Sequence, residues 1–515
     1  MDDRLKAGRA HLEGGERALE RGDNTQAREH FHAALLQFRG MELRLGEAHA
    51  LRGLATTELS GGDTDQAEEY VRTAIQTYHD LVTHLAVLDD ANMTDSMSTS
   101  AREGQAHALV LLGQVLGRSG RSEEASTVLV TARDTFEELG DLPSSANVWA
   151  ALGRVAVRAG LYAKAKGAYE KALELHNRTE NTMGQVGMFL TLAELHRLTG
   201  DLEAGEAVLN LALVITETTN DKRLQGRVLR AMGSLFMQMG HADEAQRCFE
   251  DTLLLVRDTR DLEVEGYSLL GLGELQSRAG QLGAIDCLVD GARIMGQLNH
   301  QHGVAGALFQ IAEHGIRSAE PAFALVAAEG ARRLWLTSDP VRGVGQALRL
   351  IVKSLADLQR FREAHLAAEA RAALSGELQP NALAVRDWYR ARIPVAWADD
   401  VAGASRGDLT ERASAEVSQA LMPIFDEISL PLTALSSVAG ALQVVEALAD
   451  RLPRPSPDEG DIKVDDASIS GVWDLYLMDE QQGTEFATAG GEKPPAEPGF
   501  YNDEYLFGDD DTEVE

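Results

Sequence analysis

One glycine recurs every 40 residues through the middle of this chain, and its spacing constrains the fold more than any other feature. The series is Gly120, Gly160, Gly200, Gly240 and Gly280. Around the second of them, residues 152–172 (LGRVAVRAGLYAKAKGAYEKA) read as a helix, a tight turn and a second helix. Glycine suits such a turn because it lacks a Cβ atom and accepts positive φ angles. A fixed period of this size indicates a stacked array of repeats.

Small residues recur at other fixed distances from each turn glycine. Small side chains at these positions allow the two helices of a pair to approach closely. Seven residues before the turns stand Gly113, Gly153, Ala193, Gly233 and Gly273; five residues after them stand Ala125, Ala165, Gly205, Ala245 and Ile285; twelve residues after them stand Ala132, Ala172, Ala212, Thr252 and Ala292. In the best-preserved repeat an aromatic residue, Tyr169, follows the turn by nine residues.

This pattern resembles the tetratricopeptide repeat in a lengthened 40-residue form, without the proline that often ends the standard repeat, over residues 8–375. The form is similar to that of spindle-orientation adaptors of the Pins type and of the regulatory solenoid in maltose-regulon-type activators. The resemblance implies an all-α fold, a right-handed superhelical solenoid of about nine helix-turn-helix repeats. It also implies that the chain binds proteins or peptides, and that the first helix of each pair lines the concave face that contacts them.

Departures from the period divide the chain into five parts. The parts are N-terminal repeats (1–82), an inserted polar loop (83–100), the main solenoid (101–375), a helical C-terminal cap (376–452) and a disordered acidic tail (453–515). The N-terminal repeats turn at Gly22 and Gly62, whereas Glu320 and Arg360 occupy the expected turn positions of the last two repeats. Bulky residues of the cap, Trp388, Trp397 and Phe425, are expected to cover the open end of the solenoid.

The tail is the most acidic part of the chain. Between Asp458 and Glu515 it carries 18 acidic residues against Lys463 and Lys493, a net charge of −16. Two islands of aromatic residues, 472–479 and 500–511, interrupt the acids. Such islands are typical of short docking motifs, and the alternative is a solvated tail with chance aromatics. The candidate motif residues are Trp473, Tyr476, Phe500, Tyr501, Tyr505 and Phe507.

Charge and hydropathy exclude several classes of partner. The net charge of −33 argues against binding to nucleic acid or an anionic membrane surface, because both require clustered Lys and Arg. No apolar run approaches the roughly 18 residues of a membrane-spanning helix, and the N-terminus has no apolar signal core. We therefore expect a cytoplasmic protein. Cys248 and Cys287 fall on second helices, where buried small side chains are expected instead of a metal site or a disulfide.

Motifs of catalysis are missing from the sequence. It contains no P-loop, GxSxG, HExxH or CxxC pattern. His300 and His302 stand two residues apart, a spacing that does not place both on one helix face. We therefore expect neither an enzyme nor a bound metal or cofactor.

Polar residues on the first helices recur 13, 10, 6, 3 and 2 residues before the turns, which predicts one stripe along the concave groove. Arginine is frequent in this stripe, and its guanidinium group suits carboxylates, phosphates and acidic motifs. The alternative is that each arginine pairs with an acid of the next repeat, which stabilises little. The predicted partner-binding residues are Gln114, Arg118, Asn147, Arg154, Arg158, Glu194, Arg197, Arg227, Arg230, Tyr267, Glu274, Arg278 and Arg317, with His107, Gln310 and His314 beside them.

These features predict a scaffold or adaptor for protein–protein interaction, with an acidic protein or peptide partner if the arginine stripe is the site. The acidic tail either docks in the groove and competes with that partner, or binds another protein. The alternative function is a regulatory solenoid for signalling or transcription that responds to a peptide or small ligand, although no DNA-binding or output domain is evident. The sequence leaves open the identity of the partner, the pathway and whether the chain forms homo-oligomers.

Overall fold

The computed structural model describes residues 2–21, 23–86, 91–281, 283–338, 342–375, 380–390, 401 and 404–449. The chain forms two compact units, which we call unit 1 (Met1–Thr199) and unit 2 (Gly200–Glu515). The sequence predicts one continuous solenoid over 101–375, and it shows no sign of this division because Gly200 keeps its place in the series of turn glycines.

Unit 1 contains the first half of the repeat array. Its described helices are α1 (Asp2–Glu20), α2 (Asn24–Arg39), α3 (Arg44–Ser60), α4 (Thr64–Leu85), α5 (Ala91–Arg118), α6 (Ser122–Leu139), α7 (Leu142–Arg158), α8 (Tyr162–Arg178) and α9 (Thr182–Thr199). Odd-numbered helices are the first helices of the predicted pairs, and even-numbered helices are the second helices. Each of α1, α3, α5 and α7 packs on its second helix, and α1, α3 and α5 also contact the next first helix, so these four first helices form one layer.

Unit 2 repeats this arrangement and then adds a C-terminal segment. Its described helices are α10 (Leu202–Thr219), α11 (Lys222–Met239), α12 (Ala242–Thr259), α13 (Leu262–Arg278), α14 (Ala284–Gln297), α15 (Gln301–Arg317), α16 (Pro321–Ser338), α17 (Arg342–Asp357), α18 (Phe361–Ser375), α19 (Pro380–Arg390), α21 (Arg406–Ile428), the 3-10 helix η2 (Leu432–Ser436) and α22 (Val438–Ala449). The first helices α11, α13, α15 and α17 contact one another in succession. The predicted all-α fold of helix pairs is thereby confirmed. None of the described helices has the length and apolar character that a membrane crossing requires.

The turns within the helix pairs confirm the series of glycines. Positive φ angles occur at Gly62, Gly120, Gly160, Gly200, Gly240 and Gly280. In the last two pairs the left-handed residues are Ala319 and Gln359, with φ angles of 58° and 59°. The predicted turn positions Glu320 and Arg360 are therefore wrong by one residue, because the step from Gly280 to Ala319 is one residue short of the period. The turn predicted at Gly22 lies outside the described residues.

The column of small residues makes room for a bulky side chain of the second helix. A Cβ atom placed on Gly233 would lie 2.7 Å from Cε1 of Phe249, and one on Gly113 would lie 2.5 Å from Cγ of Leu129. Phe249 and Leu129 each follow their turn glycine by nine residues, as Tyr169 does. Glycine at this position therefore sets how closely the two helices of a pair approach.

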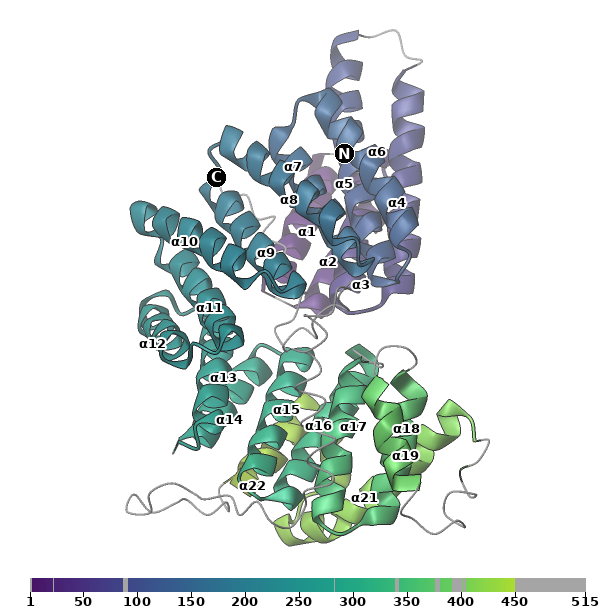
Figure 1. The fold of residues 1–515 in the computed structure, drawn as a ribbon. Helices are drawn as coiled ribbons and strands as arrows, with labels where there is room; N and C mark the ends of the chain where they lie inside the picture. The colour runs from purple at the N-terminus through teal and green to yellow at the C-terminus, as the bar shows by residue number, and fades with distance from the viewer. Residues whose placement is uncertain are drawn as a thin grey trace. The chain divides into compact units, whose positions relative to one another are not determined.

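The inserted segment between the second and third repeats lengthens two helices. The sequence predicts a loop over 83–100, but α4 continues to Leu85 and α5 already begins at Ala91. Figure 1 shows these two helices extending past their neighbours in unit 1. Leu81 and Leu85 are buried, so the added turns of α4 bury apolar surface that a loop would leave exposed. The loop prediction is therefore wrong for 83–85 and 91–100.

A second series of left-handed residues lies in the turns between successive pairs. Its members are Gly140, Glu180, Asn220, Arg260 and Asn299, and the residues that follow them are Asp141, Asn181, Asp221, Asp261 and His300. Each following residue caps the next first helix, as when the backbone N–H of Ser144 donates to Oδ1 of Asp141 at 3.1 Å. The amide of Gly184 donates to Oδ1 of Asn181 at 2.8 Å in the same way. The sequence alone does not reveal this series, because glycine occupies only its first position.

The C-terminal segment packs along the second helices of the last repeats. The helices α19 and α21 contact α18, and α22 contacts α14 and α16. Phe425 is buried, whereas Trp397 and the side chain of Trp388 lie outside the described residues. The predicted cap thus extends beyond the open end of the array and covers second helices of three pairs.

A buried ion cluster on α16 anchors this segment. Glu329 has no exposed surface and accepts hydrogen bonds from Nε of Arg332 at 2.6 Å and Nε of Arg333 at 2.7 Å. The two guanidinium groups also donate to Ser414 and Ser418 of α21, at 2.9 and 3.2 Å. Burial alone would raise the pKa of Glu329, but the two arginines outweigh it and hold that pKa below its usual range.

Candidate protein-binding faces

The predicted partner-binding residues all lie on first helices, divided between the two units. In unit 1 they are Gln114 and Arg118 on α5, Asn147, Arg154 and Arg158 on α7, and Glu194 and Arg197 on α9; in unit 2 they are Arg227 and Arg230 on α11, Tyr267, Glu274 and Arg278 on α13, and Arg317 on α15. We call the two sets the unit 1 face and the unit 2 face. The residues predicted for the tail motif, Trp473, Tyr476, Phe500, Tyr501, Tyr505 and Phe507, lie outside the described residues.

Arginines at the ends of first helices tie successive repeats together. Nη1 of Arg118, the last residue of α5, donates to the carbonyl oxygen of Leu59 on α3 at 2.9 Å. Arg158, the last residue of α7, reaches back to α5, where Nη1 lies 3.5 Å from a Cβ atom placed on Gly117. In unit 2, Nη1 of Arg317 donates to Oγ of Ser277 at 3.2 Å. Cations at these positions also interact favourably with the helix dipole, so the arginines serve the fold itself.

One arginine of the unit 1 face is buried with a carboxylate. Nε of Arg197 donates to Oε2 of Glu194 at 2.7 Å, and the side chains are 7% and 10% exposed. This pair lies three residues apart on one helix, a spacing at which side chains meet. For Arg197, the alternative prediction therefore holds: this arginine pairs with a neighbouring acid.

The unit 2 face carries a repeated cluster of carboxylate and donor groups. Glu274 accepts hydrogen bonds from Nη2 of Arg278 at 2.5 Å and from Nε2 of Gln310 at 3.1 Å. In the next repeat, Glu313 pairs with Arg317 at 3.4 Å and with Arg349 at 3.0 Å. The two glutamates are 39 residues apart in sequence. Each accepts from an arginine of its own helix and from a donor on the next first helix, so the same arrangement recurs from α13 to α15 and from α15 to α17. Burial raises the pKa of Glu274, and the nearby carboxylate of Glu313 acts in the same direction.

An aromatic contact extends this face toward α11. The guanidinium carbon of Arg230 lies 5.4 Å from the centre of the Tyr267 ring. Nε of Arg227 lies 3.8 Å from Oδ2 of Asp261, the residue that caps α13. Burial raises the pKa of Glu263, and the positive charges of Arg230 and Arg227 oppose that rise. The arginines of unit 2 thus lie among acids that already balance part of their charge.

Two residues of this face, Glu313 and Arg349, are not among the residues predicted from the sequence. Glu313 stands six residues before its turn at Ala319, as Glu274 does before Gly280, so the one-residue error in the turn position concealed it. Arg349 is recognised through its contact with Glu313, which lies 36 residues earlier in the chain. Counting back from Ala319 would have identified Glu313.

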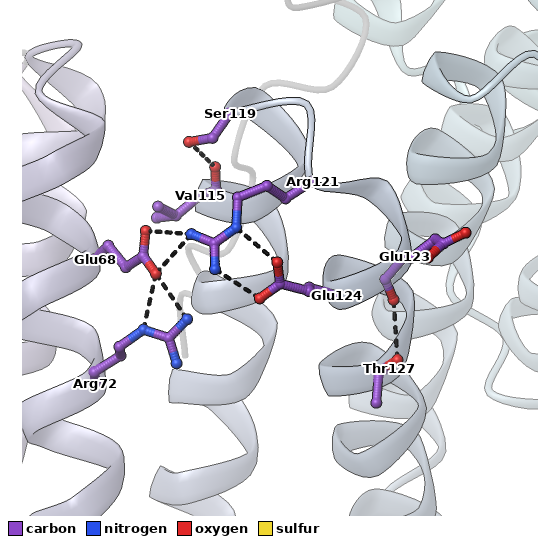
Figure 2. Close-up of polar contacts among 8 residues, drawn as sticks. All are labelled: Glu68, Arg72, Val115, Ser119, Arg121, Glu123, Glu124 and Thr127. Carbon is purple, nitrogen blue, oxygen red and sulfur yellow. Dashed lines mark hydrogen bonds and ion pairs between the residues drawn. The ribbon is translucent and has the colours of Figure 1, made fainter.

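A further charged network joins second helices in unit 1. Figure 2 shows Glu68 of α4 between Arg72 and Arg121, with Arg121 also contacting Glu124 of α6. The closest nitrogen–oxygen distances are 2.7 Å for Arg72 to Glu68, 2.9 Å for Arg121 to Glu68 and 2.6 Å for Arg121 to Glu124. The hydrogen bonds that Arg121 donates to Glu124 and Glu68 raise the pKa of Arg121 above its usual value. Glu68, Arg72 and Glu124 lie on second helices and Arg121 is the N-cap residue of α6, so the network joins neighbouring repeats outside the first-helix layer.

The described residues offer little for metal or thiol chemistry. Among them, no three His, Cys, Asp or Glu side chains are grouped as metal ligands. Cys248 on α12 is buried and Cys287 on α14 is half-buried, and both are free thiols. Burial raises the pKa of Cys248 to about 11, so its thiol stays protonated near neutral pH.

Comparison with known protein families identifies repeats in two stretches of unit 1. Two tetratricopeptide repeat profiles match residues 12–80 and 104–178. No curated protein matches the sequence. Similar solved structures include the apo form of RapI, at 12% identity and a TM-score of 0.45, covering 77% of this chain and 99% of that one. The apo form of the quorum sensor NprR from B. thuringiensis shows 13% identity and a TM-score of 0.44, covering 71% of this chain and 98% of that one. A Rap protein complexed with Competence and Sporulation Factor shows 16% identity and a TM-score of 0.40, covering 61% and 76%.

Proposed function

We propose that this chain, of which residues 12–80 and 104–178 match tetratricopeptide repeat profiles, acts as a non-catalytic scaffold or adaptor that binds a protein or peptide partner on its first helices. The observation that carries this proposal is the pair of clusters around Glu274 and Glu313 on α13, α15 and α17. They place carboxylate acceptors and guanidinium donors at repeating intervals along neighbouring helices. Peptide backbone and side chains offer both kinds of group, so a bound segment finds partners in each repeat.

The arginines favour an acidic partner. The side chain of Arg278 is 55% exposed although one of its nitrogens contacts Glu274, which is 12% exposed. A guanidinium group has five N–H donors, so the ion pair with Glu274 leaves others directed at solvent. Carboxylates of a partner can accept from these donors in a paired geometry.

The acidic tail supplies a means of regulation. Its residues 458–515 carry a net charge of −16 on the same chain as the two faces. A tethered ligand competes effectively even when its intrinsic affinity is weak, because its effective concentration is high. We therefore assign the tail a regulatory role, in which it limits access of the partner to the first-helix layer.

The test is a pull-down from native lysate with tagged full-length chains, followed by identification of the captured proteins. In the face variant, Arg230→Gln and Arg278→Gln remove two charges but keep hydrogen-bond donors. The matched control, Arg247→Gln and Arg257→Gln, removes two exposed charges from the second helix α12. The face variant should lose the partner that the control retains, provided that both have the thermal midpoint of the native chain. Equal capture by the two variants would contradict binding at the unit 2 face.

A further inference from the structure

The α7–α8 hairpin is a cationic region in an acidic chain. Residues 142–169 contain no Asp or Glu and carry four cationic side chains, whereas the whole chain has a net charge of −33. The four are Arg154, Arg158, Lys164 and Lys166. The nearest acids in sequence are Asp141, which caps α7, and Glu170.

Two of these cations oppose the dipole of their own helix. Lys164 and Lys166 lie in the first turns of α8, near the positive end of the helix dipole. Other second helices place acids there, such as Glu123 and Glu124 in α6 or Asp243 and Glu244 in α12. Lys164 follows its turn glycine by four residues, as Glu124 and Glu244 do. Helix stability therefore does not account for lysine at this position.

Both lysines are accessible to a partner. They are exposed on either side of the buried Ala165, and neither is in an ion pair within the described part of the chain. By contrast, Lys171 of the same helix lies 2.8 Å from Glu174. A Cβ atom placed on Gly160 or Gly167 would meet nothing within 4 Å, so the backbone beside the lysines is open.

Apolar groups accompany the two charges. Leu161 is 46% exposed and precedes Lys164 by three residues, and the half-buried Tyr162 precedes Lys166 by four. Side chains three and four residues apart on a helix are neighbours, so each lysine has an apolar neighbour. The region thus combines positive charge with apolar contact area. We call Arg158, Leu161, Tyr162, Lys164 and Lys166 the α7–α8 patch.

We propose that the α7–α8 patch docks residues 500–511 of this chain's own C-terminal tail. That segment, FYNDEYLFGDDD, has five carboxylates and four aromatic side chains, which complement the lysines and the apolar residues of the patch. The 50 residues between Ala449, where α22 ends, and Phe500 reach up to about 170 Å when extended. A connection of this length does not confine the segment to the neighbourhood of α22.

Docking at this position would impede binding at the unit 1 face. Arg158 belongs to both the patch and that face, because it is the last residue of α7 and reaches back to α5. The regulatory consequence rests on the proposed function, whereas the docking itself can be measured without any partner. Failure of one test therefore leaves the other informative.

The experiment uses full-length chains and a fluorescent peptide of residues 499–512, whose binding is followed by anisotropy. A tail-neutral chain carries Asp503→Asn, Glu504→Gln, Asp509→Asn, Asp510→Asn and Asp511→Asn, which should release the patch. The peptide should bind the tail-neutral chain at least about tenfold more tightly than it binds the native chain, and more weakly at high salt. Equal binding to both chains would overturn docking of the chain's own segment.

The patch is tested in the tail-neutral chain with Lys164→Glu and Lys166→Glu. These changes should weaken peptide binding at least about tenfold without lowering the thermal midpoint, because glutamate suits the start of a helix. The matched control, Lys6→Glu and Lys222→Glu, changes the net charge equally and also alters a first-turn lysine, in α11. It should leave the affinity within about twofold.

Two further outcomes would also overturn the proposal. One is equal loss of binding in the patch variant and the control, which would indicate dependence on net charge alone. The other is docking of the segment from a second copy of the chain. Light scattering would show this if the native chain were dimeric and the tail-neutral chain monomeric, because the segment of one copy would then occupy the patch of the other.

Discussion

Gly153 and Tyr169 face each other across the α7–α8 hairpin, where the ring of Tyr169 occupies the space that a side chain on Gly153 would need. A Cβ atom placed on Gly153 would lie less than 3.0 Å from Cε1 of that ring, and Tyr169 is 1% exposed. The ring therefore has little freedom to move away. This contact shows why the position seven residues before each turn must hold a small residue when the two helices of a pair pack closely.

Gly153→Ala should destabilise the protein. Overpacking costs about 1–3 kcal/mol, which exceeds the gain of about 0.5–1 kcal/mol from alanine in a helix. The control is Gly167→Ala on α8, where an added Cβ meets nothing within 4 Å. Thermal unfolding should show a lower midpoint for the first variant and a higher one for the second. An increase for both would mean that Tyr169 yields easily.

Asp141→Ala should weaken the start of α7. The carboxylate of Asp141 accepts the backbone N–H of Ser144, and loss of such a cap costs about 1 kcal/mol. Asp141→Asn should preserve stability, because Asn181 makes the equivalent contact one repeat later. Comparison of the two midpoints of thermal unfolding checks this. Similar losses in both variants would indicate that the charge, not the cap, matters.

His300→Asn should reduce the sensitivity of the protein to acid. Nδ1 of His300 accepts the backbone N–H of Gly303 at 2.9 Å, which requires a neutral ring, and burial lowers the pKa of His300 to about 4. The unfolded chain takes up this proton near pH 6.5, so it binds more protons than the folded chain between those values. Stability should therefore fall as the pH drops from about 6.5 to about 4, by up to about 3 kcal/mol for this group.

Asparagine keeps the cap and does not titrate in that range. The midpoint of thermal unfolding should thus fall less between about pH 7 and about pH 5 in His300→Asn than in the native chain. Because other histidines, such as the half-buried His49, also have lowered pKa values, part of the acid sensitivity should remain. An identical fall in both proteins would show that His300 is not responsible.

Glu329→Ala should loosen the C-terminal segment. The change leaves the guanidinium groups of Arg332, 3% exposed, and Arg333 without their carboxylate, and such a loss typically costs about 3–5 kcal/mol. Limited proteolysis should cleave within α21 and α22 much faster than in the native chain. The control Glu446→Ala breaks the exposed pair with Arg293 and should cost less than about 1 kcal/mol. Equal protease resistance of Glu329→Ala and the native chain would argue against this anchoring role.

The helix pairs and their glycine turns could be predicted because each depends on a local requirement. Gly160 must accept a φ angle of 71°, and Gly153 must leave room for Tyr169. The turns between pairs could not be predicted in the same way. Glu180 and Arg260 adopt φ angles of 54°, which nothing in their side chains favours. There the backbone closes the turn through hydrogen bonds such as the one that the N–H of Asn181 donates to the carbonyl oxygen of His176 at 3.0 Å.

The candidate faces were predictable only in part. Helical spacing placed Glu274 and Arg278 on a first helix, where the structure has them. It did not identify Gln310 and Arg349 as partners of the acids, because those contacts join helices 36 residues apart. Likewise, the sequence suggested a stripe of available arginines, whereas Arg197 and Arg317 have carboxylate neighbours.

The sequence by itself determined the repeat period, the all-α fold and the acidity of the tail, because each follows from residue type and spacing along the chain. Tertiary structure decided the continuation of α4 and α5 into the predicted loop, the docking of α22 on α14 and α16, and the carboxylate partner of each arginine. These outcomes depend on apolar burial and ion pairing between segments distant in sequence. The free energies of these contacts arise only when the helices pack against one another.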